Sequence, residues 1–268
     1  MWIHERAPSD PLLRRHIRKV WLLELEAPES FGMPERIVPD GIVEAVFHYG
    51  QPFAMRYDGE PFAEQPAGCS ISQTHRHLEI RPLGPSGFVA VRFEPWGAHH
   101  FFPASVAELA DRCVPAQALW GRDADLLLER LAAGSSAGER IALVEGFQRG
   151  QLGDHGIPEI EPWVRRLQIR RGLDSIRGLC RDLGVGERRL ERAFRTALGT
   201  TPKHYAMLVR FLYACKLLDR RPDATLTALA HELEYADQAH FSRDFKAFAG
   251  VSPGEFRAHG EIAHLDLE

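Results

Sequence analysis

Four charged side chains between positions 187 and 198 have the types and spacing to recognise nucleic acid. They repeat at i, i+3, i+4 and i+7 and therefore share one face of a helix: Arg188, Glu191, Arg192 and Arg195. A guanidinium group can donate two parallel hydrogen bonds, a geometry that matches O6 and N7 of guanine in the major groove of DNA. A charged face that meets only solvent explains the same pattern equally well. The helix alone leaves both explanations open.

The opposite face of this segment is apolar, which makes the predicted helix amphipathic. Its apolar residues are Leu190, Ala193, Phe194, Ala197 and Leu198. Arg189 adds a further guanidinium group beside the charged face. Such a helix buries one side in a core and presents the other side to a partner.

The same helical unit is built twice in the C-terminal part of the chain. Five positions recur 51 residues later, so that Leu190, Phe194, Gly199, Pro202 and Tyr205 correspond to Phe241, Phe245, Gly250, Pro253 and Phe256. Four positions upstream recur 50 residues later, so that Ile176, Leu179, Cys180 and Leu183 correspond to Leu226, Leu229, Ala230 and Leu233. A short helix, a turn and a second helix, present twice, predict two helix-turn-helix units that contact two stretches of one DNA duplex.

The second copy carries different side chains on the equivalent face. The candidates there are Gln238, Ala239, His240, Arg243 and Lys246. Asp237 precedes them as a natural N-cap. Glutamine can bond the edge of adenine, but Asp244 and Glu234 repel phosphate. We therefore expect fewer specific contacts from the second copy.

The net charge of −4 averages two unlike regions. Residues 162–221 hold 15 Lys and Arg against five Asp and Glu, whereas residues 222–257 hold three against six. Binding to the phosphate backbone requires a basic surface. Only the first copy has this charge, so the second copy must read DNA weakly or hold the first in place.

Two stretches resemble the signature of AraC-type transcription regulators. The first is Tyr235–Lys246, followed by Gly250-Val251-Ser252-Pro253, which matches in order, spacing and residue type. The second is Glu187–Phe194 with Gly199–Pro202, which is similar to the family's other helix-turn-helix. The resemblance covers about residues 160–257. It implies an all-α domain whose two units, joined by a long helix from Pro202 to about Arg220, enter successive major grooves.

The resemblance also assigns roles to residues and partners. The family's base-reading positions fall at Arg188, Glu191, Arg192, Gln238, Ala239, His240 and Arg243. The implied protein is a sequence-specific regulator of transcription, an activator in the family's usual manner, with double-stranded DNA and RNA polymerase as partners. It uses no cofactor.

Two positions depart from the family pattern. Glu234 stands where the family usually has Gly, and a non-Gly residue in a left-handed C-cap costs on the order of 1 kcal/mol. Gly186 stands where Ser or Thr usually begins the first recognition helix, so a capping hydrogen bond is lost. Both departures predict altered stability or orientation and an intact function.

The first hundred residues predict a β-rich domain. Short apolar runs separated by Gly and Pro turns are typical of a small barrel or sandwich. The expected strands are 19–26, 43–49, 68–74, 77–81 and 88–93, with turns at 39–41 and 83–87. Helices follow within residues 106–148. The predicted α+β chain thus has a β-rich domain with a helical extension at 1–150, a linker at 151–158 and the double helix-turn-helix domain at 159–260.

The N-terminal half is similar, less specifically, to the sensor-like domain found in one branch of the same family. Val38–Gly41 and Val91–Ala98 carry this likeness. It implies control by a small-molecule effector or homodimerisation through this domain. His48 and Arg92 lie inside apolar strands and Trp96 follows one, so these three are candidate effector-binding residues.

An enzyme is the alternative from another class, with the β-rich domain as a metal- or small-molecule-processing barrel. His75 and His77 would point to one side of a strand, but Glu79 follows too soon for a cupin-type metal set and nothing fixes the distance of His99-His100. We predict no metal site and no catalytic residues. No run of apolar residues is long enough to cross a membrane, and the four scattered Cys suggest a reduced cytoplasm.

Overall fold

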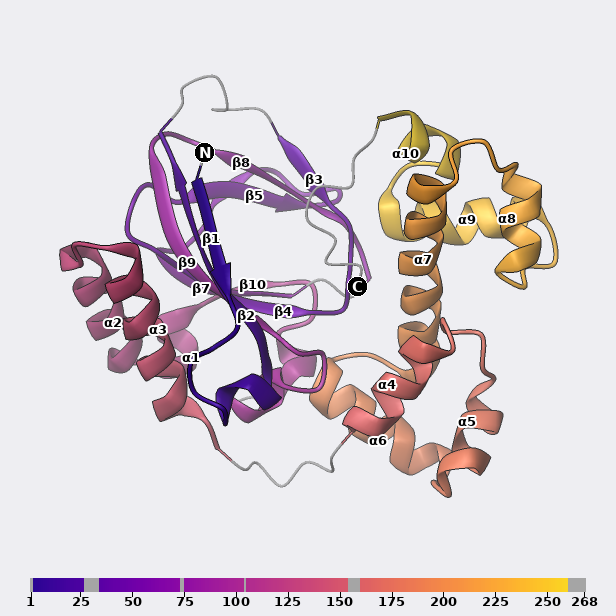
Figure 1. The fold of residues 1–268 in the computed structure, drawn as a ribbon, viewed down its shortest axis with the longest axis horizontal. Coiled ribbons are helices and arrows are strands. Elements are labelled where there is room, and N and C mark those ends of the chain that lie inside the picture. The colour runs from indigo at the N-terminus through magenta and orange to yellow at the C-terminus, as the bar shows by residue number, and fades with distance from the viewer. Residues whose placement is uncertain (1, 27–33, 73–74, 104, 154–159, 260–268) are drawn as a thin grey trace.

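The computed structural model describes residues 2–26, 34–72, 75–103, 105–153 and 160–259. We call residues 2–153 the β domain and residues 160–259 the helical domain. The two lie side by side, with a short helical layer on the far side of the β domain (Figure 1).

The β domain contains two antiparallel sheets. One has six strands in the order β1 (Trp2–Arg6), β2 (Ile17–Leu25), β9 (Ser86–Phe93), β4 (Val43–His48), β7 (Gly68–Ser72) and β10 (Cys113–Pro115). The other has four in the order β3 (Glu35–Ile37), β8 (Leu78–Pro82), β5 (Phe53–Tyr57) and β6 (Ala63–Glu64). Among the described residues no strand pair joins the sheets, so the domain is sandwich-like and does not form a closed barrel.

Strand β9 shows why the domain has two apolar layers. All eight of its residues are buried, as expected for a strand covered on both faces. Val89, Val91 and Phe93 pack into the cluster that includes the helical layer, whereas Phe88 and Ala90 pack toward the interior that contains Phe53 and Cys69. The sheet therefore has no solvent-facing side at its centre.

The helical layer consists of α1 (Ala116–Trp120), α2 (Arg122–Ala133) and α3 (Ala137–Gln151). The connections include three 3-10 turns, η1 (Leu13–Arg15), η3 (Ala98–His100) and η4 (Val106–Glu108). The first of the helices predicted within residues 106–148 is only the short η4, begun by a hydrogen bond from Ala107 N–H to Ser105 Oγ. Most of the expected linker, residues 154–158, lies outside the described residues.

The helical domain contains α4 (Glu161–Ile169), α5 (Ile176–Leu183), α6 (Glu187–Leu198), α7 (Pro202–Arg220), α8 (Leu226–Glu232), α9 (Gln238–Ala249) and α10 (Pro253–His259). One apolar core runs through all of it. Helices α5 and α6 form the first helix-turn-helix unit, and α8 and α9 form the second, at opposite ends of α7 (Figure 1).

The predicted strands correspond to β2, β4, β7, β8 and β9, with ends shifted by two residues at most; residues 73–74 of the third prediction lie outside the described residues. The predicted helices of the helical domain match within one or two residues. Strands β1, β3, β5, β6 and β10 were not predicted.

Candidate nucleic-acid interface and interdomain cavity

Helix α6 is fixed by a tight turn before it and an apolar face beneath it. Gly184 ends α5 in the left-handed region with φ of +63°, and Gly186 is the N-cap of α6 without a side-chain cap. Leu190, Phe194 and Ala197 are fully buried in the core of the helical domain. The helix therefore has one orientation relative to that core.

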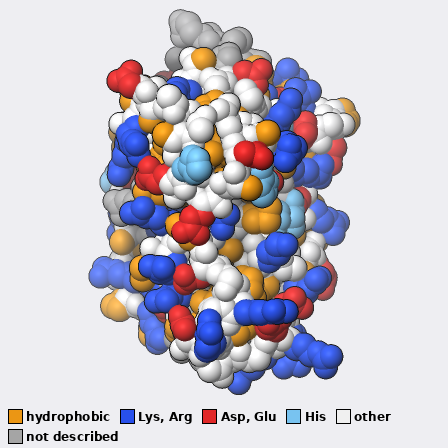
Figure 2. Space-filling view, turned by 90° about the vertical axis from the view of Figure 1, so that its right-hand side faces the viewer, with side chains coloured by type: hydrophobic (Ala, Val, Ile, Leu, Met, Phe, Trp, Pro, Cys, Tyr) orange, Lys and Arg blue, Asp and Glu red, His pale blue; other side chains and the backbone are white. Residues whose placement is uncertain are grey.

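The charged face of α6 points into solvent. All five predicted residues are exposed: Arg188, Arg189, Glu191, Arg192 and Arg195. Within the described ranges, no ion pair or hydrogen bond occupies any of the four guanidinium groups. Figure 2 shows Lys and Arg side chains spread over the face that the helical domain turns away from the β domain. The donors of α6 are available for an external partner.

Helix α9 presents the equivalent face, and the side chains of Gln238 and His240 on it already have partners. Gln238, Ala239, His240, Arg243 and Lys246 are all exposed. The Thr227 hydroxyl of α8 donates to Gln238 Oε1 at 2.8 Å, and His240 Nε2 lies 3.6 Å from Asp244 Oδ2. Asp237 caps the helix by accepting a hydrogen bond from His240 N–H at 2.7 Å. Contact with DNA must compete with these interactions.

The turn before α9 contains the non-glycine residue that the sequence singled out. Glu234 has φ of +57°, in the region that favours glycine, and occupies the position that Gly184 fills in the first unit. Tyr235 N–H bonds Ala230 O at 2.9 Å, as Val185 N–H bonds Cys180 O at 3.0 Å. The turn geometry is thus conserved between the units despite the change of residue.

Helix α7 sets the separation of the two units. Its 19 residues span about 28 Å at 1.5 Å per residue. Successive major grooves on one side of DNA lie roughly 34 Å apart. The length of α7 is of the same order as this groove spacing.

The first unit is braced by the β domain. Ser105 Oγ donates to the carbonyl of Thr196 in α6 at 3.4 Å. A Cβ on Gly199, at the end of α6, would lie 2.9 Å from Val106 O. The C-terminal end of the first recognition helix therefore rests on η4 and leaves its N-terminal arginines clear.

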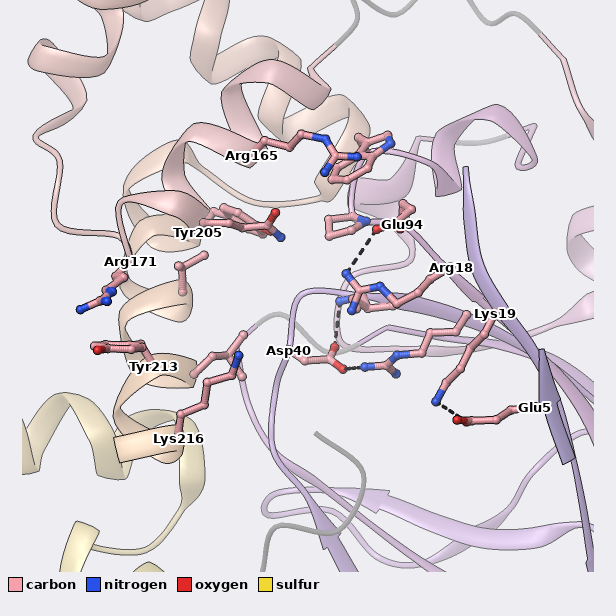
Figure 3. Close-up of a pocket in the computed structure, with 17 residues that line it drawn as sticks. Glu5, Arg18, Lys19, Asp40, Glu94, Arg165, Arg171, Tyr205, Tyr213 and Lys216 are labelled. Carbon is pink, nitrogen blue, oxygen red and sulfur yellow. Dashed lines mark hydrogen bonds and ion pairs between the residues drawn. The ribbon is translucent and has the colours of Figure 1, made fainter. Parts of the chain in front are cut away.

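A cavity of about 540 Å³ lies between the two domains (Figure 3). Arg92 and Trp96, two of the predicted effector residues, line it. Its other charged lining residues are Arg18, Lys19, Arg165, Arg171, Lys216, Glu5, Asp40 and Glu94. Six cationic side chains thus face three carboxylates.

Ion pairs tie the β-domain wall of this cavity together. Arg92 bonds Asp40 and, at 3.0 Å, Glu44, while Arg18 bonds Glu94 at 3.2 Å. From the helical domain, the Arg165 guanidinium lies 4.3 Å from the centre of the Trp96 ring. Arg171 lies equally close to Tyr213. On the wall from the helical domain, Arg165 also pairs with Glu161 at 2.6 Å.

His48 lies away from this cavity, inside the β domain. Its Nε2 is 2.9 Å from Gln65 Oε1, and its ring packs against Phe53 and Phe88. Burial lowers the pKa of His48 to about 4, so the ring is neutral at neutral pH. It acts there as a packed polar side chain of the core.

The residues weighed as metal ligands lie in separate places. His75 contacts Asp111 and the ring of His204, His77 lies against Gly250, and His99 and His100 stack at the base of the β domain beside His16. Among the described residues, no group of three or more His, Cys, Asp or Glu is placed to hold a metal ion. No described helix is both long and apolar enough to cross a membrane.

The geometry defines a class before any comparison: two helix-turn-helix units joined by one long helix, an arrangement typical of DNA-binding proteins, attached to a sandwich-like domain. A family described as "Helix-turn-helix domain" matches residues 179–259, and a family described as "Domain of unknown function (DUF6597)" matches residues 4–115. The two matches thus fall on the two parts of the chain, the helix-turn-helix family on the helical domain and the DUF6597 family on the β domain. No curated protein matches the sequence.

Several solved structures are similar in arrangement. ToxT from Vibrio cholerae is 10% identical with a TM-score of 0.48, covering 96% of this chain and 98% of its own. ToxT from strain SCE256 bound to an unsaturated fatty acid is 12% identical with a TM-score of 0.45, covering 88% and 93%. The C-terminal domain of AraT, a response regulator from Geobacillus stearothermophilus, is 25% identical with a TM-score of 0.34, covering 39% and 90%.

Proposed function

We propose that the chain is a sequence-specific transcription regulator in which α6 supplies most of the affinity and base recognition. The observation that carries this proposal is the exposed row of four arginines on α6, whose guanidinium groups have no partner among the described residues. Each good bidentate contact to guanine contributes about 1–3 kcal/mol of discrimination. Helix α9 then adds a weaker second contact about one turn of DNA away.

The assigned DNA contacts are Arg188, Arg189, Glu191, Arg192 and Arg195 in the first unit and Gln238, Ala239, His240, Arg243 and Lys246 in the second. Their common exposure on the outer faces of α6 and α9 supports this assignment. Three further properties follow only from the resemblance to AraC-type regulators and stay predictions: RNA polymerase as a partner, transcription activation and homodimerisation.

Selection of bound duplexes from a random-sequence pool by the full-length protein tests the proposal. We expect enrichment of a site with two motifs about one helical turn apart, the stronger of which belongs to α6. Enrichment of a single motif would restrict base reading to the first unit. If no sequence is enriched even at low salt, the protein alone does not bind DNA sequence-specifically, and the proposal fails.

We further propose that a small-molecule effector binds in the interdomain cavity, in contact with Arg92 and Trp96. The lining holds six cationic groups against three carboxylates, but Arg18, Lys19, Arg92 and Arg165 are already in ion pairs. We therefore expect an anion to contact Arg171, with Tyr205, Tyr213 and Trp96 offering aromatic surface for its body. Because the cavity is built from both domains, a bound ligand would change the stability of their contact. This gives an effector a physical route to the DNA-binding units.

Thermal unfolding of the protein against a panel of carboxylates and phosphates tests the effector site. A hit should raise the unfolding temperature, and Arg171→Gln should reduce that rise. Arg170→Gln is the matched control, because Arg170 pairs with Asp174 and does not line the cavity. Equal ligand responses in parent and Arg171→Gln would place the ligand elsewhere.

A further inference from the structure

The β domain contacts the second helix-turn-helix unit through the turn His75–Arg76–His77, which precedes β8. The His75 ring lies against the ring of His204 in the first turn of α7, with centroids 4.3 Å apart and the ring planes tilted by 35°. His204 in turn lies 5.2 Å from the Phe248 ring of α9. These residues are far apart in sequence, so this turn is a specific contact between the domains.

His77 makes the closest part of this contact, on the backbone at the end of α9. A Cβ placed on Gly250 would lie 2.3 Å from Cε1 of the His77 imidazole, so the ring rests directly on the glycine. Gly250 also has φ of +75°. Glycine is required here both for its left-handed backbone and for the space that the ring occupies.

The turn is held in shape by the β domain. The backbone N–H of His75 donates to Asp111 Oδ1 at 3.0 Å, and its imidazole pairs with the same carboxylate. Arg76 donates to Glu60 at 2.7 Å and lies over the Tyr57 ring at 4.7 Å. The turn therefore presents both imidazole rings to the helical domain in a fixed arrangement.

We propose that the turn His75–Arg76–His77 is an interdomain latch, which holds the second helix-turn-helix unit against the β domain and opens when His77 takes up a proton. The contact of His75 with His204 lies in the first turn of α7, while Ser105 and Val106 brace the preceding end of α6 through a separate set of contacts. Opening the latch would release the C-terminal end of α9 from the β domain and would leave the brace on α6 in place.

The charged groups around His77 set the direction of the pH response. Burial lowers the pKa of His77 below its ordinary value of 6.5. The carboxylates of Asp58 and Glu79 oppose this shift, and the guanidinium groups of Arg36 and Arg56 add to it. From the helical domain, the ring faces the backbone of Gly250. The neutral ring is the form that docks, so latching is complete above pH 6.5. It weakens as the pH falls below 6.5, because the undocked ring then binds a proton that the docked ring excludes.

Hydrogen exchange of the full-length, DNA-free protein tests the latch independently of any DNA site. His77→Ala and Gly250→Ala should each raise exchange of amides 246–256 about tenfold, while amides 187–198 of the first unit keep the parent rate. Gly184→Ala is the matched control, because it introduces the same left-handed strain at φ of +63° where no neighbouring atom would meet the Cβ. It should affect the first unit only.

A titration of the His77 ring by NMR completes the test. Its pKa should lie below 6.5 in the parent and move toward 6.5 in Gly250→Ala, where the added methyl group lifts the ring from the backbone. His77→Gln keeps a planar polar side chain and should retain slow exchange at amides 246–256. The rise in exchange that the parent shows between pH 6.5 and 5.5 should be mostly absent from this variant. If His77→Ala leaves these amides unchanged, or if the pKa of His77 is the same in parent and Gly250→Ala, there is no latch.

Discussion

The first and second helix-turn-helix units follow one backbone plan and differ in their surfaces. Gly199 and Gly250 end the two recognition helices with φ of +71° and +75°, and Ser175 and Thr225 cap the two preceding helices through their hydroxyl groups. On its exposed face, α6 carries arginines without a partner among the described residues, whereas α9 carries Gln, His and Arg among carboxylates. The duplicated fold was therefore kept by its core, while the exposed faces diverged in charge.

The units also differ in where their local stability comes from. The first has glycine in its left-handed turn and no side-chain cap on α6; the second has Glu234 in that turn and Asp237 as a cap on α9. Each unit thus has one favourable terminus and one unfavourable one. The comparison can be tested at each of these positions.

The largest expected difference between the units lies in affinity for DNA. Arg192→Ala should weaken binding to the selected site by ~1–3 kcal/mol and relax the preference at one base pair. Arg192→Lys, which keeps the charge but loses the bidentate fork, should restore affinity more than base preference. Competition gel shifts with single-base variants of the site measure both effects. Equal affinity and equal preference in parent and Arg192→Ala would remove Arg192 from the interface.

Removing the cap of α9 should give the next largest effect, on stability. Asp237→Ala should lower the free energy of unfolding by about 1 kcal/mol, because His240 N–H loses its acceptor. Asp237→Gly is the control and should cost only a few tenths of a kcal/mol. Urea unfolding measures both variants, and no loss of stability in Asp237→Ala would show that the capping bond contributes nothing.

Exchanging the turn residues should move the stability of each unit in opposite directions. Glu234→Gly should raise the free energy of unfolding by about 0.5–1 kcal/mol, since it relieves a left-handed non-glycine residue. Gly184→Ala should lower it by a similar amount at the equivalent place in the first unit. Thermal unfolding of both variants checks the pair. A loss of stability in Glu234→Gly would mean that the Glu234 side chain makes a favourable interaction.

The smallest expected effect is that of removing Arg243 from the second unit. Arg243→Ala should cost about 0.5 kcal/mol of binding, less than Arg192→Ala, because Asp244 and Glu234 make its surroundings acidic. The same gel shifts, with the salt concentration varied, measure this cost. A larger loss for Arg243→Ala than for Arg192→Ala would overturn the proposed ranking of the two units.

The helical domain could be predicted closely because its signals are local. Apolar spacing, the caps at Ser175 and Asp237, and the glycines at 184, 199 and 250 each act within one or two turns of a helix. The positive φ at Glu234 followed from the family pattern, which usually has Gly at this position. Exposure of the α6 arginines followed from the apolar face opposite them.

The β domain and the cavity could be predicted only in part because their signals are not local. Strand β1 is exposed along most of its length at a sheet edge, so it shows no alternation of apolar and polar residues. Arg18 and Arg171 line one cavity from positions far apart in the chain. Basic residues within an apolar strand, as at Arg18 and Lys19, were the available signal. His48 carried the same signal as Arg92, yet it faces the interior of the β domain.

The path of α7 through a single core has a consequence for how the helical domain can unfold or be divided. Phe211 of α7 packs against Phe245 and Phe248 of the second unit, with ring centroids 4.9 and 5.0 Å apart. Tyr205 of the same helix packs against Phe194 of the first unit. A chain cut after α7 would leave Phe211 without its aromatic partners. The two units should therefore unfold in one cooperative transition, and removal of either unit should destabilise the other.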